Sequence, residues 1–311
     1  MRSCRSITET AAGLGKMRET GSNHRAIEYR KLYEEGRRAL EKVGILDAAL
    51  DARLLLEEVC GTNLQTLLVY PEEEVSEDNA ARYRSWIERR CSREPTAMIL
   101  GKWDFMGLTF RLNRSTLIPE QDTECLVEAA LNWAGKRQDR MLKILDLCTG
   151  SGCILLSLLH AIPEAEGLGT DISGEALKAA RQNCENLELT KKARFLQGDL
   201  WKPVEEEKFD LIVSNPPYVP TGVIPTLEPE VRTGEPYAAL DGGEDGLVFY
   251  RKILREARRH LCPEGTIIME SGFDEADAIA ALMKEAGFAG IEIFKDYGGL
   301  DRVVQGSAEQ L

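Results

Sequence analysis

The sequence predicts an α/β protein in which helices cover both faces of a mostly parallel sheet, and a small helical domain comes first. From residue 142 onward, short apolar runs rich in β-branched residues alternate with stretches of helical periodicity. Such alternation builds right-handed crossovers between parallel strands. Residues 25–93 instead carry apolar side chains at helical spacing, and we expect no strand there.

Seven strands are expected in the α/β part, with helices between most of them. The strands are Lys143–Cys148, Gly167–Ile172, Ala193–Gln197, Phe209–Ser214, Gly265–Glu270, Gly290–Lys295 and Arg302–Gln305. The clearest helices are Gly174–Leu187, Leu247–His260 and Glu275–Ala286.

Helix-ending and capping residues divide the helical region. Gly44 and Gly61 stand where helices end in the left-handed conformation, and Asn63 and Ser76 can cap the helices that follow them. The last helix carries five arginines, which predict either a solvated face or a contact patch for an acidic or RNA-bearing partner. They are Arg82, Arg84, Arg89, Arg90 and Arg93.

Residues 1–23 are expected to be a disordered lead-in, followed by a helical domain at 24–95 that Glu94-Pro95 ends. Ala97–Leu100 and Leu108–Leu112 predict a β-hairpin connector at residues 96–118. The remaining domain, residues 119–311, opens with Asp122-Thr123-Glu124 before an amphipathic helix, where a helix cap is their ordinary role.

Composition excludes several classes of protein. A formal charge of -13 and a pI near 5.0 argue against a surface that binds phosphate backbones by charge alone. No apolar run has the length of a membrane span, and no signal peptide is recognisable, so we expect a cytoplasmic protein. The eight cysteines form no CxxC pair and predict free thiols. Three widely separated histidines predict neither a zinc site nor a His-based triad.

The stretch Ser214-Asn215-Pro216-Pro217-Tyr218 is the strongest functional signal. It follows a predicted buried strand, so it lies at the carboxyl end of the sheet, where open α/β sheets bind ligands. Two prolines hold Asn215 extended and contribute carbonyl groups without N–H groups. A stiff loop of hydrogen-bond acceptors suits a substrate –NH2 group. The alternatives are an Asx-type turn for Asn215 and simple crevice filling for Tyr218.

Three other strand ends carry residues suited to a nucleoside. Cys148-Thr149-Gly150-Ser151-Gly152 follows the first strand and can bring backbone N–H groups close to a ligand. Asp171, 21 residues after Gly150, can accept both ribose hydroxyls, unless it only caps the next helix. Ser173 can serve as that cap instead, which leaves the Asp171 carboxylate free. Asp199 can accept from an adenine amino group. Because Cys148 occupies the first glycine position of a dinucleotide motif, S-adenosylmethionine fits better than NAD.

These motifs and others outside the sheet resemble the release-factor glutamine methyltransferases (the PrmC/HemK family) over nearly all of residues 25–305. The shared segments are Leu46-Asp47 and Asp51-Ala52, Glu94-Pro95, Ile99-Leu100-Gly101, Leu117-Ile118-Pro119, Thr123-Glu124, the loop at 146–152, Asp171, Asn215–Tyr218, Glu235-Pro236, Ala239–Gly243, Asp245–Leu247, Lys295–Tyr297 and Leu300–Val304. The Asn-Pro-Pro-Tyr element is also found in DNA adenine and ribosomal RNA guanine methyltransferases, so alone it indicates only methylation of an amino group.

The resemblance implies a class I methyltransferase (Rossmann-like) fold with a seven-stranded sheet, an N-terminal helical bundle that recognises the substrate, and a β-hairpin connector. It implies transfer of a methyl group from S-adenosylmethionine to the glutamine of the Gly-Gly-Gln motif of peptide-chain release factors. We expect a monomeric enzyme that binds no nucleic acid directly. The implied cofactor residues are Cys148, Thr149, Gly150, Ser151, Gly152, Asp171, Asp199, Leu200 and Asn215. The implied substrate residues are Asn215, Pro216, Pro217 and Tyr218, with Asn215, Pro216 and Tyr218 catalytic.

The chain departs from the family at two places. Glu120-Gln121 replaces the usual Arg-Pro and reverses a charge near the expected site, so no role is carried over to these two residues. In the family, an aromatic residue usually follows the Asp at the end of the third strand, which is Asp199 here. This chain has Leu200 at that position and Trp201 one residue later, and either side chain can cover the adenine. Two other readings remain: a nucleic-acid amino methyltransferase, which should carry a basic groove, and a non-catalytic binding protein, which should have a degraded acceptor loop.

Overall fold

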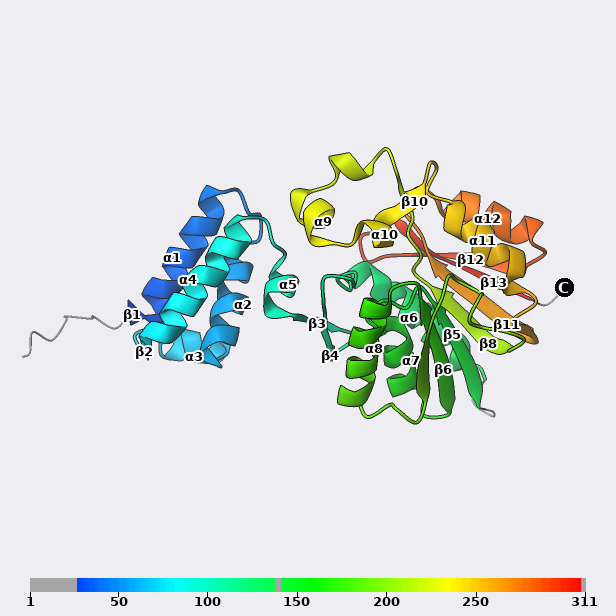
Figure 1. The fold of residues 1–311 in the computed structure, drawn as a ribbon, viewed down its shortest axis with the longest axis horizontal. Coiled ribbons are helices and arrows are strands. Elements are labelled where there is room, and N and C mark those ends of the chain that lie inside the picture. Colours follow the sequence, from blue (N-terminus) through cyan, green and yellow to red (C-terminus); the bar gives the residue numbers. More distant parts are fainter. Residues whose placement is uncertain (1–26, 138–140, 309–311) are drawn as a thin grey trace, which may run out of the picture.

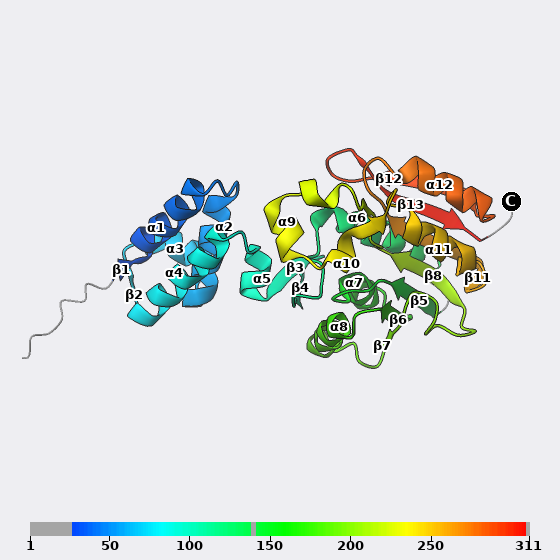
Figure 2. The same ribbon diagram turned by 45° about the horizontal axis from the view of Figure 1, so that its top comes forward.

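A computed structural model of the chain describes residues 27–137 and 141–308; the lead-in expected at residues 1–23 lies outside the described residues. A helical bundle and an α/β part lie at opposite ends of the molecule, with a small hairpin between them (Figure 1). The view in Figure 2 shows the same separation after rotation.

The bundle follows the predicted helices closely. The Asn63 side chain accepts from Thr66 N at 2.9 Å and the Ser76 hydroxyl from Asn79 N at 3.2 Å, so both predicted caps are confirmed. The prediction that no strand occurs here is wrong, because two short segments pair antiparallel, Ile27 with Val75. The elements are β1 (Ile27–Glu28), α1 (Tyr29–Lys42), α2 (Ala48–Cys60), α3 (Leu64–Val69), β2 (Glu74–Val75) and α4 (Glu77–Cys91).

One glycine inside α1 permits the bundle to pack closely. A Cβ at Gly36 would lie 2.0 Å from the Tyr83 hydroxyl oxygen, a distance that no side chain tolerates. Tyr83 is fully buried on α4, and its hydroxyl donates to the Ala52 carbonyl on α2 at 3.2 Å. A glycine weakens a helix by about 1 kcal/mol relative to alanine, and here it lets one tyrosine join three helices.

The connector differs from the prediction in its first half. Residues Ala97–Leu100, expected as a strand, belong to the short helix α5 (Thr96–Leu100), which begins after Pro95 and ends at Gly101 with φ of +68°. A short helix satisfies its own backbone groups, whereas a strand here would need a partner. The hairpin itself consists of β3 (Lys102–Phe105) and β4 (Leu108–Arg111), joined by a two-residue turn. Both turn residues have positive φ, as hairpin turns of this type require.

The α/β part contains the seven-stranded, mostly parallel sheet that the sequence predicts. The order is β12-β13-β11-β8-β5-β6-β7, with β13 antiparallel to both of its neighbours. The strands are β5 (Leu142–Leu147), β6 (Ala165–Asp171), β7 (Ala193–Gln197), β8 (Phe209–Ser214), β11 (Leu261–Glu270), β12 (Ala289–Lys295) and β13 (Asp301–Ser307). Predicted and observed bounds differ by at most a few residues.

Alternating side chains of the central strands point into two hydrophobic cores, one on each face of the sheet. Ile144 packs in one core and Leu145, the next residue of β5, packs in the other. The first face is covered by α6 (Gln121–Ala134), α7 (Cys153–Ala161) and α8 (Gly174–Asn186), and the second by α11 (Val248–Ala257) and α12 (Ala276–Glu285). This two-sided burial explains why the parallel strands read as continuous apolar runs.

An irregular segment after β8 passes between the sheet and the bundle (Figure 2). It contains β9 (Val219–Pro220), a 3-10 turn (Ile224–Thr226), α9 (Pro229–Gly234), α10 (Tyr237–Leu240) and β10 (Asp241–Gly243). Glu230 of α9 accepts from Arg90 at 3.1 Å and from Arg93 at 3.0 Å, both on or next to α4. These ion pairs attach the segment to the helical bundle.

The five arginines of the last bundle helix form internal contacts. Arg90 is buried, with its side chain 10% exposed, so the solvated face that was one of the two predictions for these arginines does not include it. Four of the five pair with carboxylates, which reduces the free positive charge available to a phosphate backbone. The contacts are Arg82 over the Trp86 ring, Arg84 with Glu35, Arg89 with Glu94, Arg90 with Asp51 and Glu230, and Arg93 with Glu230.

Several carboxyl groups in the α/β part have raised pKa values, chiefly because burial disfavours their charged form, and four of these values are near 7 or 8. The pKa is about 7 for Asp146 and Glu275 and about 8 for Glu235 and Glu270. Glu270, at the end of β11, is 1% exposed.

Within the described residues, no helix combines the length and the apolar character that a membrane crossing requires. Six cysteines of this part of the chain are free thiols, in agreement with the sequence prediction: Cys60, Cys91, Cys125, Cys148, Cys153 and Cys184. These residues also contain no group of histidine, cysteine and carboxylate side chains that could hold a metal ion.

Arg90→Ala should destabilise the protein by about 3 kcal/mol, because it leaves the buried Asp51 carboxylate without its cation. The matched control is Arg84→Ala, which removes a largely exposed pair and should cost no more than about 1 kcal/mol. Urea unfolding of the two variants and the parent measures both values. Equal losses would show that the buried pair contributes nothing special.

Glu270→Gln should reduce the loss of stability that the protein suffers between pH 5 and pH 8. A carboxyl group whose folded pKa of about 8 exceeds its ordinary value stabilises the fold at low pH, and this stability is lost as the pH rises towards 8. The control is Glu264→Gln, which changes an exposed carboxyl group of the same strand. Thermal unfolding across this pH range should give a flatter profile for Glu270→Gln alone.

Candidate active site

A pocket of about 560 Å³ opens at the carboxyl ends of the central strands, within the range of small-molecule sites. It lies where the chain order reverses across the sheet, between β5 and β8. Nine of the predicted site residues line it: Cys148, Thr149, Gly150, Ser151, Asp171, Asp199, Leu200, Asn215 and Pro217. Three others, Gly152, Pro216 and Tyr218, lie beside it without lining it.

The loop after β5 exposes backbone to this pocket. Cys148 has φ of +63° and Gly150 φ of +54°, so the chain turns sharply here. A Cβ at Gly150 would meet no atom within 4 Å, which leaves open space above it. Gly152 serves helix packing instead, because a Cβ there would lie 3.2 Å from Ala180 on α8 and would push α7 away from its neighbour.

Asp171 joins the ends of β5 and β6. One carboxylate oxygen accepts from Gly150 N at 2.9 Å and the other from Ser173 N at 2.8 Å. Ser173 itself caps α8 through Ala176 N, as predicted, but the expectation of a free Asp171 carboxylate is wrong. Burial raises the pKa of Asp171, and these backbone N–H groups lower it. Each oxygen keeps a second lone pair for a ligand.

The segment after β7 shows which of two side chains covers the pocket. Leu200 lines it, whereas Trp201 stacks on His260 with ring centroids 4.7 Å apart and so belongs to the core beneath. Asp199 also lines the pocket and pairs with Lys202 at 2.9 Å. Ile172, which is 64% exposed, and Phe249 add apolar surface at the rim.

At the end of β8, the acceptor loop lies against the cofactor loop. The buried Ser214 hydroxyl donates to the Leu147 carbonyl at 2.7 Å, which joins the ends of β8 and β5. Asn215 donates through its side-chain nitrogen to the Thr123 hydroxyl at 3.3 Å. Among the described residues, the Asn215 side-chain oxygen has no such partner, so it remains an available acceptor.

The glycine-rich segment at 241–247 packs on the backbone of this loop. A Cβ at Gly242 would lie 2.7 Å from Tyr218 Cα, and one at Gly246 would lie 2.5 Å from the Tyr218 carbonyl oxygen. Only glycine permits this approach. Tyr218 in turn donates to Glu270 at 3.5 Å, and burial together with nearby carboxylates raises its pKa well above the usual range.

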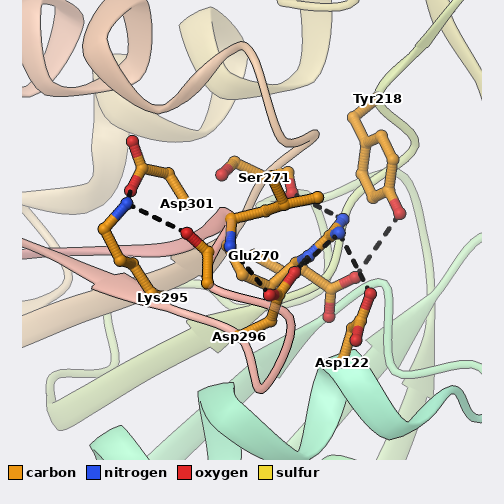
Figure 3. A network of polar contacts seen from close by, with 10 residues as sticks. Asp122, Tyr218, Glu270, Ser271, Lys295, Asp296 and Asp301 are labelled. Carbon is orange, nitrogen blue, oxygen red and sulfur yellow. Dashed lines mark hydrogen bonds and ion pairs between the residues drawn. The ribbon is translucent and has the colours of Figure 1, made fainter.

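A charged network lies beside Tyr218 (Figure 3). Arg302 of β13 contacts Asp122 at 3.0 Å and Asp296 at 3.1 Å, and donates to the Ser271 carbonyl at 3.3 Å. Glu270 lies between this network and Tyr218. The sequence did offer a signal for Glu270: it is a charged residue that ends an otherwise apolar predicted strand, Gly265–Glu270.

The residues at the start of α6 have roles other than the predicted cap. Glu120 occupies the N-cap position but makes no side-chain capping bond, and neither Asp122 nor Thr123 caps the helix. Glu124 accepts from Met106 N at 2.7 Å and so holds the hairpin turn. Glu120 is exposed, and partial desolvation and the nearby Asp122 raise its pKa. Thr123, buried against Asn215, is a site residue that the sequence reasoning missed.

Comparison with known proteins identifies the family. The family described as "PrmC N-terminal domain" matches residues 31–101, and "Methyltransferase domain" matches residues 138–298. A release factor glutamine methyltransferase of Caulobacter vibrioides is 41% identical over 89% of this chain and 95% of its own length. One of Agrobacterium fabrum is 42% identical over 86% and 93%. A solved structure of a protein-(glutamine-N5) methyltransferase (release factor-specific) from Alicyclobacillus acidocaldarius is 28% identical, covering 62% of this chain and 95% of that one, with a TM-score of 0.39.

The pocket fits the cofactor of such enzymes, S-adenosylmethionine. Carboxylates at two adjacent strand ends, Asp171 and Asp199, can accept from ribose hydroxyls and an amino group. Leu200, Ile172 and Phe249 offer apolar contact to a flat base, and the open space over Gly150 admits a ligand close to the backbone.

Family match, fold and pocket therefore agree: the chain belongs to the release factor glutamine methyltransferases, and its cofactor is S-adenosylmethionine.

Proposed function

We propose that this protein methylates the side-chain amide nitrogen of the glutamine in the Gly-Gly-Gln motif of peptide-chain release factors, and thereby supports translation termination. The observation that carries the proposal is the available Asn215 oxygen, in a loop of acceptors joined to the cofactor loop through Ser214. The names of the relatives supply the substrate. Such a substrate implies a cytoplasmic enzyme, and one chain contains all the proposed site residues, in keeping with a monomer.

The acceptor loop solves a chemical difficulty of this substrate. A glutamine amide nitrogen is a weak nucleophile because its lone pair is delocalised into the carbonyl group. Bound S-adenosylmethionine supplies a methyl group on a positively charged sulfonium. The Asn215 side-chain oxygen and the Pro216 carbonyl each accept one N–H of the glutamine and direct the nitrogen lone pair towards that methyl group. Tyr218 packs against the flat amide.

Catalysis on this proposal rests on positioning rather than on a strong base. The two acceptors stabilise the positive charge that develops on nitrogen as the new N–C bond forms and the S–C bond breaks. The nitrogen then loses one proton to solvent, which leaves the methylated amide neutral. Cys148, Thr149, Ser151, Asp171, Asp199 and Leu200 hold the cofactor in this scheme, and Pro217 shapes the opening between the two ligands.

We further propose that the helical domain at residues 24–95 recognises the release factor, with residues 96–118 as its connector. The competing nucleic-acid reading needs free cations, and α4 offers few because its arginines contact side chains of the protein itself. The competing non-catalytic reading needs a damaged acceptor loop, whereas Asn215, Pro216, Pro217 and Tyr218 are all present.

Asp171→Ala should weaken S-adenosylmethionine binding about tenfold or more, because it removes a charged acceptor for two hydroxyl groups. Calorimetric titration of the purified variant measures the affinity. The control is Asp277→Ala, which changes an exposed carboxylate on α12. An unchanged affinity for Asp171→Ala would assign that residue to holding the loop and helix alone.

Incubation with methyl-labelled S-adenosylmethionine and either a peptide-chain release factor or ribosomal RNA should label only the protein. Replacing the motif glutamine of the release factor by alanine should abolish labelling. Asn215→Ala should lower the rate roughly 100-fold while leaving cofactor affinity intact, since it removes one charge-stabilising acceptor.

Label found only in RNA would overturn the proposed substrate. A normal rate for Asn215→Ala would overturn the proposed clamp, in which the Asn215 oxygen and the Pro216 carbonyl accept from the glutamine amide. It would leave the substrate assignment standing. The two parts of the proposal are thus tested separately by one assay.

A further inference from the structure

The register of the sheet places Glu270 next to the acceptor loop. Strands β8 and β11 run parallel with Ser214 opposite Met269, so the next residues along the two chains, Asn215 and Glu270, lie side by side at this edge of the sheet. Glu270 is 1% exposed, and one of its carboxyl oxygens has no hydrogen-bond partner among the described residues. A buried carboxyl group with an unused oxygen beside a proposed catalytic loop calls for a role.

Thr123 lies between these two side chains. It sits in the first turn of α6 and is 2% exposed. Its hydroxyl oxygen accepts from the Asn215 side-chain nitrogen at 3.3 Å, and its own hydrogen bond to Glu270 lowers the pKa of that carboxyl group. Tyr218, at the other end of the loop, also donates to Glu270. Both ends of the acceptor loop are therefore connected to the buried Glu270 carboxyl group, Tyr218 directly and Asn215 through Thr123.

The direction of these hydrogen bonds has a consequence for Asn215. A hydroxyl group has only one hydrogen to donate. Glu270 presents a carboxyl oxygen that can accept from Thr123 whether the group is protonated or ionised. When the Thr123 hydroxyl directs its hydrogen to that oxygen, it can only accept from Asn215, and the Asn215 nitrogen faces it. The Asn215 oxygen then faces the pocket. The opposite orientation would present an –NH2 group to a substrate –NH2 group, and neither could accept from the other.

We propose that Thr123 and Glu270 are positioning residues of the methyl transfer: together they orient the Asn215 amide so that its oxygen, and not its nitrogen, faces the substrate nitrogen. The inference rests on the function proposed above. It assigns a purpose to two residues to which that scheme gives no role, Glu270 and the pocket-lining Thr123.

Contacts of the neighbouring residues hold Glu270, Thr123 and Asn215, the relay of the proposal, in place. Asp122, the neighbour of Thr123, lies close to Glu270 in Figure 3 and is bound by Arg302 of β13 at 3.0 Å. Val303, the next residue of β13, lies opposite Glu270. The start of α6 is thus attached to the sheet at the level of Glu270. An apolar replacement of Thr123 keeps this attachment and removes only the hydroxyl, which makes the relay testable.

Thr123→Val should lower kcat about tenfold, because the Asn215 amide then lacks the acceptor that selects its orientation. KM for the release factor and the affinity for S-adenosylmethionine should stay within about twofold, since valine has nearly the shape of threonine and the pocket lining keeps its form. Thr123→Ser retains the hydroxyl and should recover most of kcat. The matched control is Thr96→Val, at a buried threonine far from the site whose hydroxyl has no partner in the described part of the chain.

Glu270 is tested by two variants of similar length. Glu270→Gln keeps an oxygen that accepts from Thr123 and should retain much of kcat, whereas Glu270→Met removes the acceptor and should repeat the Thr123→Val loss. Thr123→Ala serves in place of Thr123→Val if the valine variant fails to fold, as judged by thermal unfolding.

A double-mutant cycle decides whether Thr123 acts through Asn215. In the Asn215→Ala background, Thr123→Val should have no further effect on the single-turnover rate with labelled cofactor. The same factor in both backgrounds would overturn the inference, as would a wild-type kcat for Thr123→Val when Asn215→Ala is impaired. A fully active Asn215→Ala enzyme would overturn the proposed clamp itself and the inference with it.

Discussion

The hydrogen bond from the Ser214 hydroxyl to the Leu147 carbonyl is the contact on which the proposed site depends. Both residues are fully buried and end adjacent parallel strands. Beyond Leu147 the chain turns into the cofactor loop, and beyond Ser214 it enters the acceptor loop. Because the strand ends are level and joined at 2.7 Å, the two loops begin at one point, so the methyl donor and its acceptor can share one pocket.

Packing behind the acceptor loop makes it rigid from the other side. Gly242 and Gly246 approach the Tyr218 backbone more closely than any side chain would permit. Two prolines restrict the same loop from within. A catalytic strategy based on positioning needs such rigidity, because a displacement of an ångström changes the reaction rate strongly. The same prolines and glycines that shape this loop in the fold therefore also give it the rigidity that the proposed chemistry needs.

The bundle is connected to the site through a short path. Glu230 of α9 binds two arginines of the bundle, and the chain then continues into residues Pro236, Ala238 and Ala239, which line the pocket. These bonds cross between the proposed recognition domain and the catalytic domain. The pairing also consumes cations that would otherwise give α4 the electrostatic character of a nucleic-acid surface.

Local sequence was sufficient to predict the seven strands of the large sheet, the two caps at Asn63 and Ser76, and the strand-end positions of Asp171 and Asn215. These follow from local periodicity and from the rule that parallel strands end at one edge. The folded chain was needed to establish that Ala97–Leu100 is helical, that Leu200 and not Trp201 reaches the pocket, and that Thr123 contacts Asn215. These outcomes depend on contacts between segments far apart in the chain, such as β8 with β11. Short-range sequence patterns do not determine which distant side chains come into contact.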